Sequence, residues 1–171
     1  RPLLLTSGRT LGKLDVAMAD VVGPFEVETF NQGKYLLTLR DVGTGYSEAK
    51  VLVTKDQSFQ MLIDTIIDGN HKPLFSKDSL TDNGGEFSSQ TLTDFLIAKG
   101  IRAERSLPYH HYQNGVIQHF NRMLQEMGCT VFIDSGLGKS LWGFSFIWAC
   151  DLLNLIRNKH SGLIMPYEAF H

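Results

Sequence analysis

The segment Val16–Val22 restricts the fold more than any other part of the chain. It is apolar at nearly every position, which is typical of a central strand that is buried on both faces of a sheet. Two further strand patterns follow, Lys34–Val42 and Ser47–Thr54, and turn signals at positions 31–33 and 43–45 precede them. Three consecutive strands joined by short turns predict an antiparallel meander.

Beyond the third strand, helical and strand patterns alternate. A period of 3.6 residues predicts a helix over Gln57–Asp68 and another that begins near Ser88–Ser89 and ends at Gly100. Short strand patterns cover Ser79–Asp82 and Ile101–Arg105. With 171 residues, of which 43% are apolar, we expect one α/β domain over positions 1–171, with 1–13 as an extended lead-in.

Two long helical patterns complete the chain. The first runs from about Asn114 to Met127, with a buried stripe at Ile117, Phe120, Leu124 and Met127. Its polar residues, on the opposite side, are Gln118, Asn121, Arg122 and Gln125. The second, Leu141–Arg157, is apolar almost all round, so we expect it to be deeply buried or shared with another subunit. Its aromatic residues are then core or dimer contacts: Trp142, Phe144, Phe146 and Trp148.

Composition narrows the setting in which this chain works. The net charge is -2, so a nucleic-acid partner would have to be held by a local basic face rather than by overall attraction. Cys129 and Cys150 are not at metal-finger spacing, which favours a reducing compartment. No segment has the length and apolarity of a membrane span, and no secretory signal opens the chain, so we expect an intracellular protein. Because the chain begins at Arg1, we also expect it to be part of a longer protein.

Three polar positions stand out by their order and spacing. Asp20 lies near the end of the first strand, Asp82 lies within Thr81–Phe87 (TDNGGEF), and Gln118 lies within Asn114–Arg122 (NGVIQHFNR). Positions 83–117, which are 35 residues, separate the last two. Taken singly, each is ordinary, since Asp-Asn-Gly-Gly is a common turn and an exposed glutamine on a helix is unremarkable. The three together are not explained by turns and surface residues.

With these segments, and with Pro108–Arg122 and the closing Pro166-Tyr167-Glu168, the chain resembles the catalytic core of retroviral and retrotransposon integrases. The resemblance is greatest to the copia type of long-terminal-repeat element. It implies a ribonuclease-H-like α/β fold, in which a five-stranded mixed sheet, three antiparallel strands and then two parallel additions, is flanked by helices. It also implies cleavage and joining of DNA phosphodiesters with Mg²⁺ or Mn²⁺ as cofactor.

The resemblance assigns roles to the three polar positions. Asp20 and Asp82 match the two aspartates that ligate the metal, and Gln118 occupies the position of the third acid of the family. The family has Glu followed by Arg there, whereas this chain has Gln118-His119. An amide lowers the number of negative charges at the site from three to two, and it cannot accept a proton as a general base would. We therefore expect catalysis by this chain to be impaired.

The remaining expectations concern partners. The resemblance implies DNA as a partner, a homodimer, a host protein as a possible tether, and a nuclear location. The expected nucleic-acid contacts are Tyr109, His110, His111, Asn114, Gly115, His119 and Arg122. Two interpretations stay open: an integrase core whose active site has lost one acid, or a domesticated or decayed module that binds nucleic acid or protein and dimerises without catalysis.

Overall fold

The fold was analysed in a computed structural model, which describes residues 12–13, 15–58, 60–61, 78–81, 94, 97–98, 102–105, 115–157 and 163–171. Its sheet has the strand order β3-β2-β1-β4-β5 within these residues. The strands are β1 (Val16–Val22), β2 (Tyr35–Asp41), β3 (Ser47–Leu52), β4 (Asp78–Thr81) and β5 (Arg102–Arg105). The helical elements are α3 (Gly115–Ser135), the 3-10 turn η4 (Lys139–Leu141), α4 (Trp142–Leu155) and α5 (Pro166–Phe170).

The strand pairing confirms the α/β class and the antiparallel meander. β1 pairs antiparallel with β2, and β2 pairs antiparallel with β3. On its other side β1 pairs parallel with β4, which in turn pairs parallel with β5. The strand β1 therefore occupies the centre of the sheet, as its apolar sequence predicts, and four of its residues from Val16 to Ala19 are buried.

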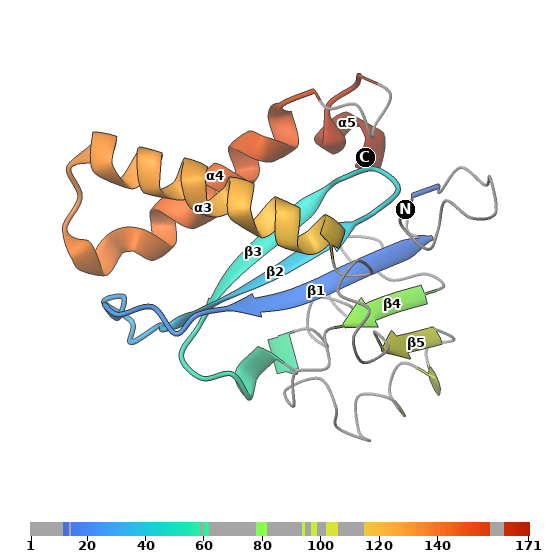
Figure 1. Ribbon diagram of the computed structural model, residues 1–171, viewed down its shortest axis with the longest axis horizontal. Helices are drawn as coiled ribbons and strands as arrows, with labels where there is room; N and C mark the ends of the chain where they lie inside the picture. The colour runs from blue at the N-terminus through green and yellow to red at the C-terminus, as the bar shows by residue number, and fades with distance from the viewer. Residues whose placement is uncertain are drawn as a thin grey trace.

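The helices α3 and α4 lie side by side over the face of β1, β2 and β3 (Figure 1). Phe120 and Leu124 of α3 are 2% and 0% exposed, and burial of such a side chain stabilises the fold by roughly 1.5–3 kcal/mol. The buried core between the helices and the sheet consists of Met18, Leu36, Ile117, Phe120, Leu124, Trp142, Phe146, Ala149 and Cys150. The stripe predicted for α3 is confirmed in its three buried members, and Met127 packs partly buried against the same core.

The helix α3 extends eight residues beyond Met127, where the sequence analysis ended it. A glycine inside a helix ordinarily costs about 1 kcal/mol relative to alanine, so Gly128 looks like a stop signal. In the structure Gly128 is buried, and a Cβ atom there would lie 3.0 Å from the ring of Phe146 on α4. The glycine is explained by the close approach of the two helices rather than by a helix end.

The helix α4 is buried on one side and exposed on the other, so deep burial, one of the two expectations for it, holds for one face only, and sharing of the exposed face with another subunit stays a prediction. Trp142 and Phe146 belong to the core, whereas Phe144 and Trp148 are 55% and 58% exposed. No helix among the described residues is long and apolar enough to cross a membrane. The helices predicted over Gln57–Asp68 and up to Gly100 lie mostly outside the described residues, although residues 57–58, 60–61, 94 and 97–98 are helical.

Asn154 of α4 fixes the start of β3. Its Oδ1 accepts a hydrogen bond from the backbone N–H of Ser47 at 2.9 Å, and its Nδ2 donates to the backbone carbonyl of Ser47 at 2.8 Å. Both side chains are buried. The Asn154 side chain therefore makes the two backbone hydrogen bonds that an adjacent strand would otherwise make at the first residue of β3.

We expect Asn154→Leu to lower the free energy of unfolding by about 2–4 kcal/mol, because it leaves a buried N–H without a partner and weakens the bonding of a buried carbonyl. Urea unfolding followed by circular dichroism measures this loss. Asp151→Leu, at an exposed position one turn earlier on α4, is the matched control and should change stability by less than about 0.5 kcal/mol. Equal effects of the two variants would contradict this role of Asn154.

Candidate functional site

Asp20 lies where β1 passes the end of β4. It is half-buried, and it pairs with Thr38 of β2 in the antiparallel register. On the other side Ala19 pairs with Thr81, the last described residue of β4. The chain therefore brings the residue before Asp20 and the residue before Asp82 into register. Asp82 itself lies outside the described residues.

The helix α3 contacts Asp20 through Asn121. The Nδ2 atom of Asn121 donates a hydrogen bond to Oδ2 of Asp20 at 2.7 Å, and Oδ1 of Asp20 accepts from the backbone N–H of Val21 at 2.9 Å. Asn121 is only 5% exposed. The prediction that it belongs to the solvent-facing polar side of the helix is wrong, because α3 turns this position toward the end of β1.

The other end of the same amide has no partner in the part of the chain that the structure describes. Oδ1 of Asn121 is buried and accepts no hydrogen bond within the described residues. An unsatisfied buried acceptor costs about 1–3 kcal/mol, so native structures contain few of them. An asparagine selected for stability alone would be expected to satisfy both ends. Asn121 Oδ1 is therefore an unsatisfied acceptor, among the described residues, on the same amide that binds Asp20.

Gln118 precedes Asn121 by three residues on α3 and is exposed. Residues three apart are neighbours on a helix surface, so Gln118 lies beside the residue that binds Asp20. Because the Gln118 side chain is exposed, the prediction that position 118 faces away from the core is confirmed. No group of three or more His, Cys, Asp or Glu side chains that could hold a metal occurs in the part of the chain that the structure describes, which includes Asp20 and not Asp82.

The structure describes three of the seven expected nucleic-acid contacts. Gly115 is half-buried at the start of α3, and His119 and Arg122 are exposed on the same helix. Gly115 and His119 line a pocket against β2 and α4, so they also face a cavity. The other four, Tyr109, His110, His111 and Asn114, lie outside the described residues.

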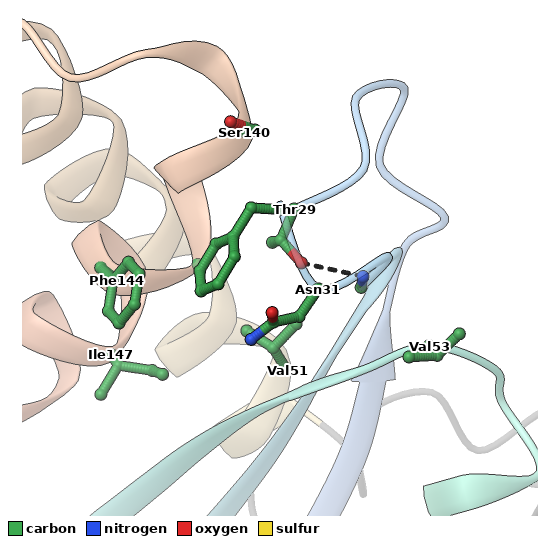
Figure 2. A pocket seen from close by; sticks show the side chains of 10 residues that line it. Thr29, Asn31, Val51, Val53, Ser140, Phe144 and Ile147 are labelled. Carbon is green, nitrogen blue, oxygen red and sulfur yellow. Dashed lines mark hydrogen bonds between the residues drawn. The ribbon is translucent and has the colours of Figure 1, made fainter.

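A second feature is an apolar pocket between α4 and the loop that precedes β2 (Figure 2). The rings of Phe30 and Phe144 stack with centroids 5.6 Å apart, and Ile147 and Val51 lie beside them. Its cavity volume is about 200 Å³. In Figure 2 the dashed line marks the hydrogen bond that Gly33 N–H donates to Thr29 Oγ1 at 2.8 Å, which closes the loop. The described residues that line this pocket include no titratable side chain.

Sequence comparison relates the chain to retroelement polyproteins. It is 34% identical over 155 residues to the retrovirus-related Pol polyprotein from transposon TNT 1-94 of Nicotiana tabacum, which is 87% of this chain and 11% of that protein. It is 32% identical over 88 residues, 52% of this chain and 6% of the relative, to the Pol polyprotein from transposon RE2 of Arabidopsis thaliana. The chain thus spans about a tenth or less of the length of these relatives. No protein-family model matches it.

Solved structures of similar fold are integrases. The simian T-cell lymphotropic virus intasome, in complex with the PP2A regulatory subunit B56 gamma, matches with a TM-score of 0.74 at 18% identity, over 95% of this chain and 56% of that chain. The HTLV-2 integrase catalytic core domain in complex with magnesium, in a trimeric form, matches with a TM-score of 0.69 at 15% identity, over 95% of this chain and all of that one. This chain has the fold of retroviral integrase catalytic cores and is similar in sequence to retroelement Pol polyproteins. The fold expected from the resemblance, that of integrase catalytic cores, is confirmed.

Sequence reasoning missed Asn121 as a residue of the candidate site. Asn121 could have been found from its spacing, because it lies three residues after Gln118 and residues three apart share a face of a helix. The sequence analysis counted Asn121 among the polar, solvent-facing residues of the helix. Hydropathy alone does not distinguish a solvent-facing amide from a buried amide that binds a carboxylate.

We expect Asn121→Asp to make stability depend on pH. Two carboxylates in contact raise the pKa of one of them above its unfolded value near 4, so the folded state binds the extra proton. The variant should therefore be close to wild type in stability below pH 4 and lose about 1–3 kcal/mol as the pH rises to 7, measured by urea unfolding in EDTA. Asn31→Asp, the same change at an exposed position, should show no such loss. A flat pH profile for Asn121→Asp would show that the contact with Asp20 is absent in solution.

Proposed function

We propose that this chain is the core of a retroelement polynucleotidyl transferase of the copia type, whose reaction is cleavage of DNA ends and strand joining. The observation that supports it most directly is the hydrogen bond from Asn121 to Asp20, which sets α3 against the end of β1. Gln118 lies about one turn before Asn121 on the same helix, which supports its assignment to the site. We infer that Asp82, the residue after Thr81, completes the site, because a single residue advances the chain by only about 3.8 Å.

The residues present fit a divalent cation such as Mg²⁺ or Mn²⁺. These ions prefer hard oxygen ligands, and Asp20 offers a carboxylate beside a buried amide oxygen that has no partner among the described residues. We propose that Asp20 and Asp82 would hold the metal. The chemistry supplied by bound metal is activation of the attacking oxygen and stabilisation of the leaving oxygen.

Gln118 limits this chemistry. Its amide oxygen is neutral, so the site has two protein carboxylates where the family has three, and attraction for a second cation falls. The amide also cannot accept a proton from the attacking group. We therefore propose that strand cleavage and joining by this chain are weak or absent. DNA would be its partner, with Tyr109, His110, His111, Asn114, Gly115, His119 and Arg122 as contacts.

Gln118→Glu tests the proposal. We expect the variant to bind Mn²⁺ at least about tenfold more tightly, equivalent to 1.4 kcal/mol, and to nick a labelled DNA end at a correspondingly higher rate. Calorimetry and a gel assay measure the two effects. Gln125→Glu adds the same charge two turns further along α3 and should change neither, and adding Asp20→Asn to the Gln118→Glu variant should abolish the gain.

The alternative is a domesticated or decayed module without catalysis. If Gln118→Glu stays folded, gains no affinity for Mn²⁺ and nicks no DNA, the site has lost more than one acid and this alternative replaces the transferase. A remaining affinity for DNA or for a host protein would then define what the module does. Both interpretations share the single domain over 1–171 and the nuclear location that we propose.

We also propose that the domain forms a homodimer through α4. Phe144 and Trp148 are more than half exposed, and Phe144 stacks on Phe30, which is 57% exposed. Monomers rarely leave adjacent large aromatic side chains in water, because contiguous apolar patches favour association. The apolar pocket beside Phe144 extends the same surface.

We expect Trp148→Glu to weaken self-association at least tenfold, because the charge would have to be buried in the interface. Sedimentation velocity over a series of protein concentrations measures the change. Ile133→Glu, at a position of α3 that is 78% exposed, introduces the same charge outside this surface and should leave association as it is. A monomeric wild-type protein at high micromolar concentration would rule out the dimer.

A further inference from the structure

A second pocket lies on the side of α3 that faces β2 and the end of α4. Its cavity volume is about 330 Å³, within the range of small-molecule sites. Most of the lining is apolar, and the two side chains that carry or can carry a positive charge are Arg40 and His119. The lining residues are Arg40, Gly45, Gly115, Val116, His119, Phe120, Met123, Leu153 and Ile156.

Arg40 comes from β2, where it pairs with Met18, so it stands among residues that pack beneath the helices. Its guanidinium lies over the ring of Phe120, with the central carbon 4.9 Å from the ring centroid. Nη1 donates to the backbone carbonyl of Gly45 at 2.9 Å and to Oγ of Ser47 at 2.8 Å. These contacts fix the plane of the guanidinium at the wall of the pocket.

The rest of the Arg40 guanidinium makes no hydrogen bond to the residues that the structure describes. Nη1 makes both hydrogen bonds, and neither Nη2 nor Nε has one within the described residues. Among the described residues, two fully buried side-chain atoms lack a hydrogen-bond partner, Oδ1 of Asn121 and Oγ of Ser145. Nη2 and Nε of Arg40 are not among them, so both are in contact with solvent. Arg40 lines the pocket, and we infer that these two nitrogens are the part of the guanidinium available to a ligand there.

Arg40 also makes no ion pair with a residue that the structure describes, although Asp41 lies near enough to attract its charge. The ion pairs among the described residues join Lys34 to Glu28 and Lys50 to Glu48. The neighbouring carboxylate, Asp41, accepts hydrogen bonds from the N–H and hydroxyl of Thr44. Burial lowers the pKa of Arg40 to about 10, so the group remains positive at neutral pH in a partly dehydrated place.

We propose that this pocket binds a carboxylate attached to an apolar body. The free edge of a guanidinium presents two parallel N–H donors, which is the geometry that a carboxylate accepts. The side chains of Val116, Met123 and Leu153 would then cover the apolar part of the ligand. The ligand is either a free organic acid or the C-terminal residue of a peptide, since both carry this group.

A phosphate fits less well. A doubly charged group with three exposed oxygens needs several donors, whereas one guanidinium edge and the exposed His119 face a wall that is otherwise apolar. The site is separate from the contact between Asn121 and Asp20. It does not depend on the proposed transferase function.

The test uses the protein labelled with ¹³C at its methionine methyl groups. Met123 lines the pocket and reports binding, and Met165, at the start of α5, serves as an internal control. We expect phenylacetate to shift the Met123 signal saturably, and phenylacetamide, which lacks the charge, to bind at least tenfold more weakly. N-acetylphenylalanine, which mimics a peptide C-terminus, distinguishes the two sources of the carboxylate by its affinity relative to phenylacetate.

Variants assign the effect to Arg40. Arg40→Leu should weaken phenylacetate at least tenfold, and Lys139→Leu, which removes one exposed positive charge at the far end of α4, should change it less than twofold. If Arg40→Leu does not fold, Arg40→Lys keeps the charge without the two parallel donors and should still weaken binding at least threefold. Equal binding of phenylacetate and phenylacetamide, or equal competition by inorganic phosphate, would overturn the proposal.

Discussion

The hydrogen bond from Asn121 to Asp20 joins residues 101 positions apart and sets the relation between the helical layer and the sheet at the candidate site. It holds the first turns of α3 over the end of β1, and the position of Gln118 follows from it. Its acceptor is a carboxylate, and hydrogen bonds to charged groups stabilise the folded state by about 1.5–3 kcal/mol. The bond is also partly buried. The core packing of Phe120 supports the same alignment from within the helix.

The parts of this arrangement that depend on hydropathy were predictable. Val16–Val22 is a central strand because its residues are apolar on both faces, and Ile117, Phe120 and Leu124 are buried because they recur at helical spacing. The extent of α3 was not predictable, since Gly128 normally weakens a helix and only the ring of Phe146 explains it. That contact joins two helices and has no local signature.

The residues of the candidate site also fall into those that the sequence could predict and those that it could not. Asp20, Asp82 and Gln118 could be selected from order and spacing, which a sequence preserves. The burial of Asn121 and the open edge of Arg40 could not, because both depend on which face α3 turns toward the sheet. An arginine in the middle of a strand gives no indication that one of its nitrogens bonds to Gly45 and Ser47 while the others have no partner among the described residues.

The contact between Gly128 and Phe146 extends the constraint on the site to a position that touches no polar group. Position 128 follows Asn121 by seven residues, about two helical turns. A side chain at 128 would meet the ring of Phe146, so either this ring or the spacing of the two helices would have to give by a few tenths of an ångström. The same helix therefore carries, two turns apart, a position that limits how α3 packs on α4 and the amide that binds Asp20.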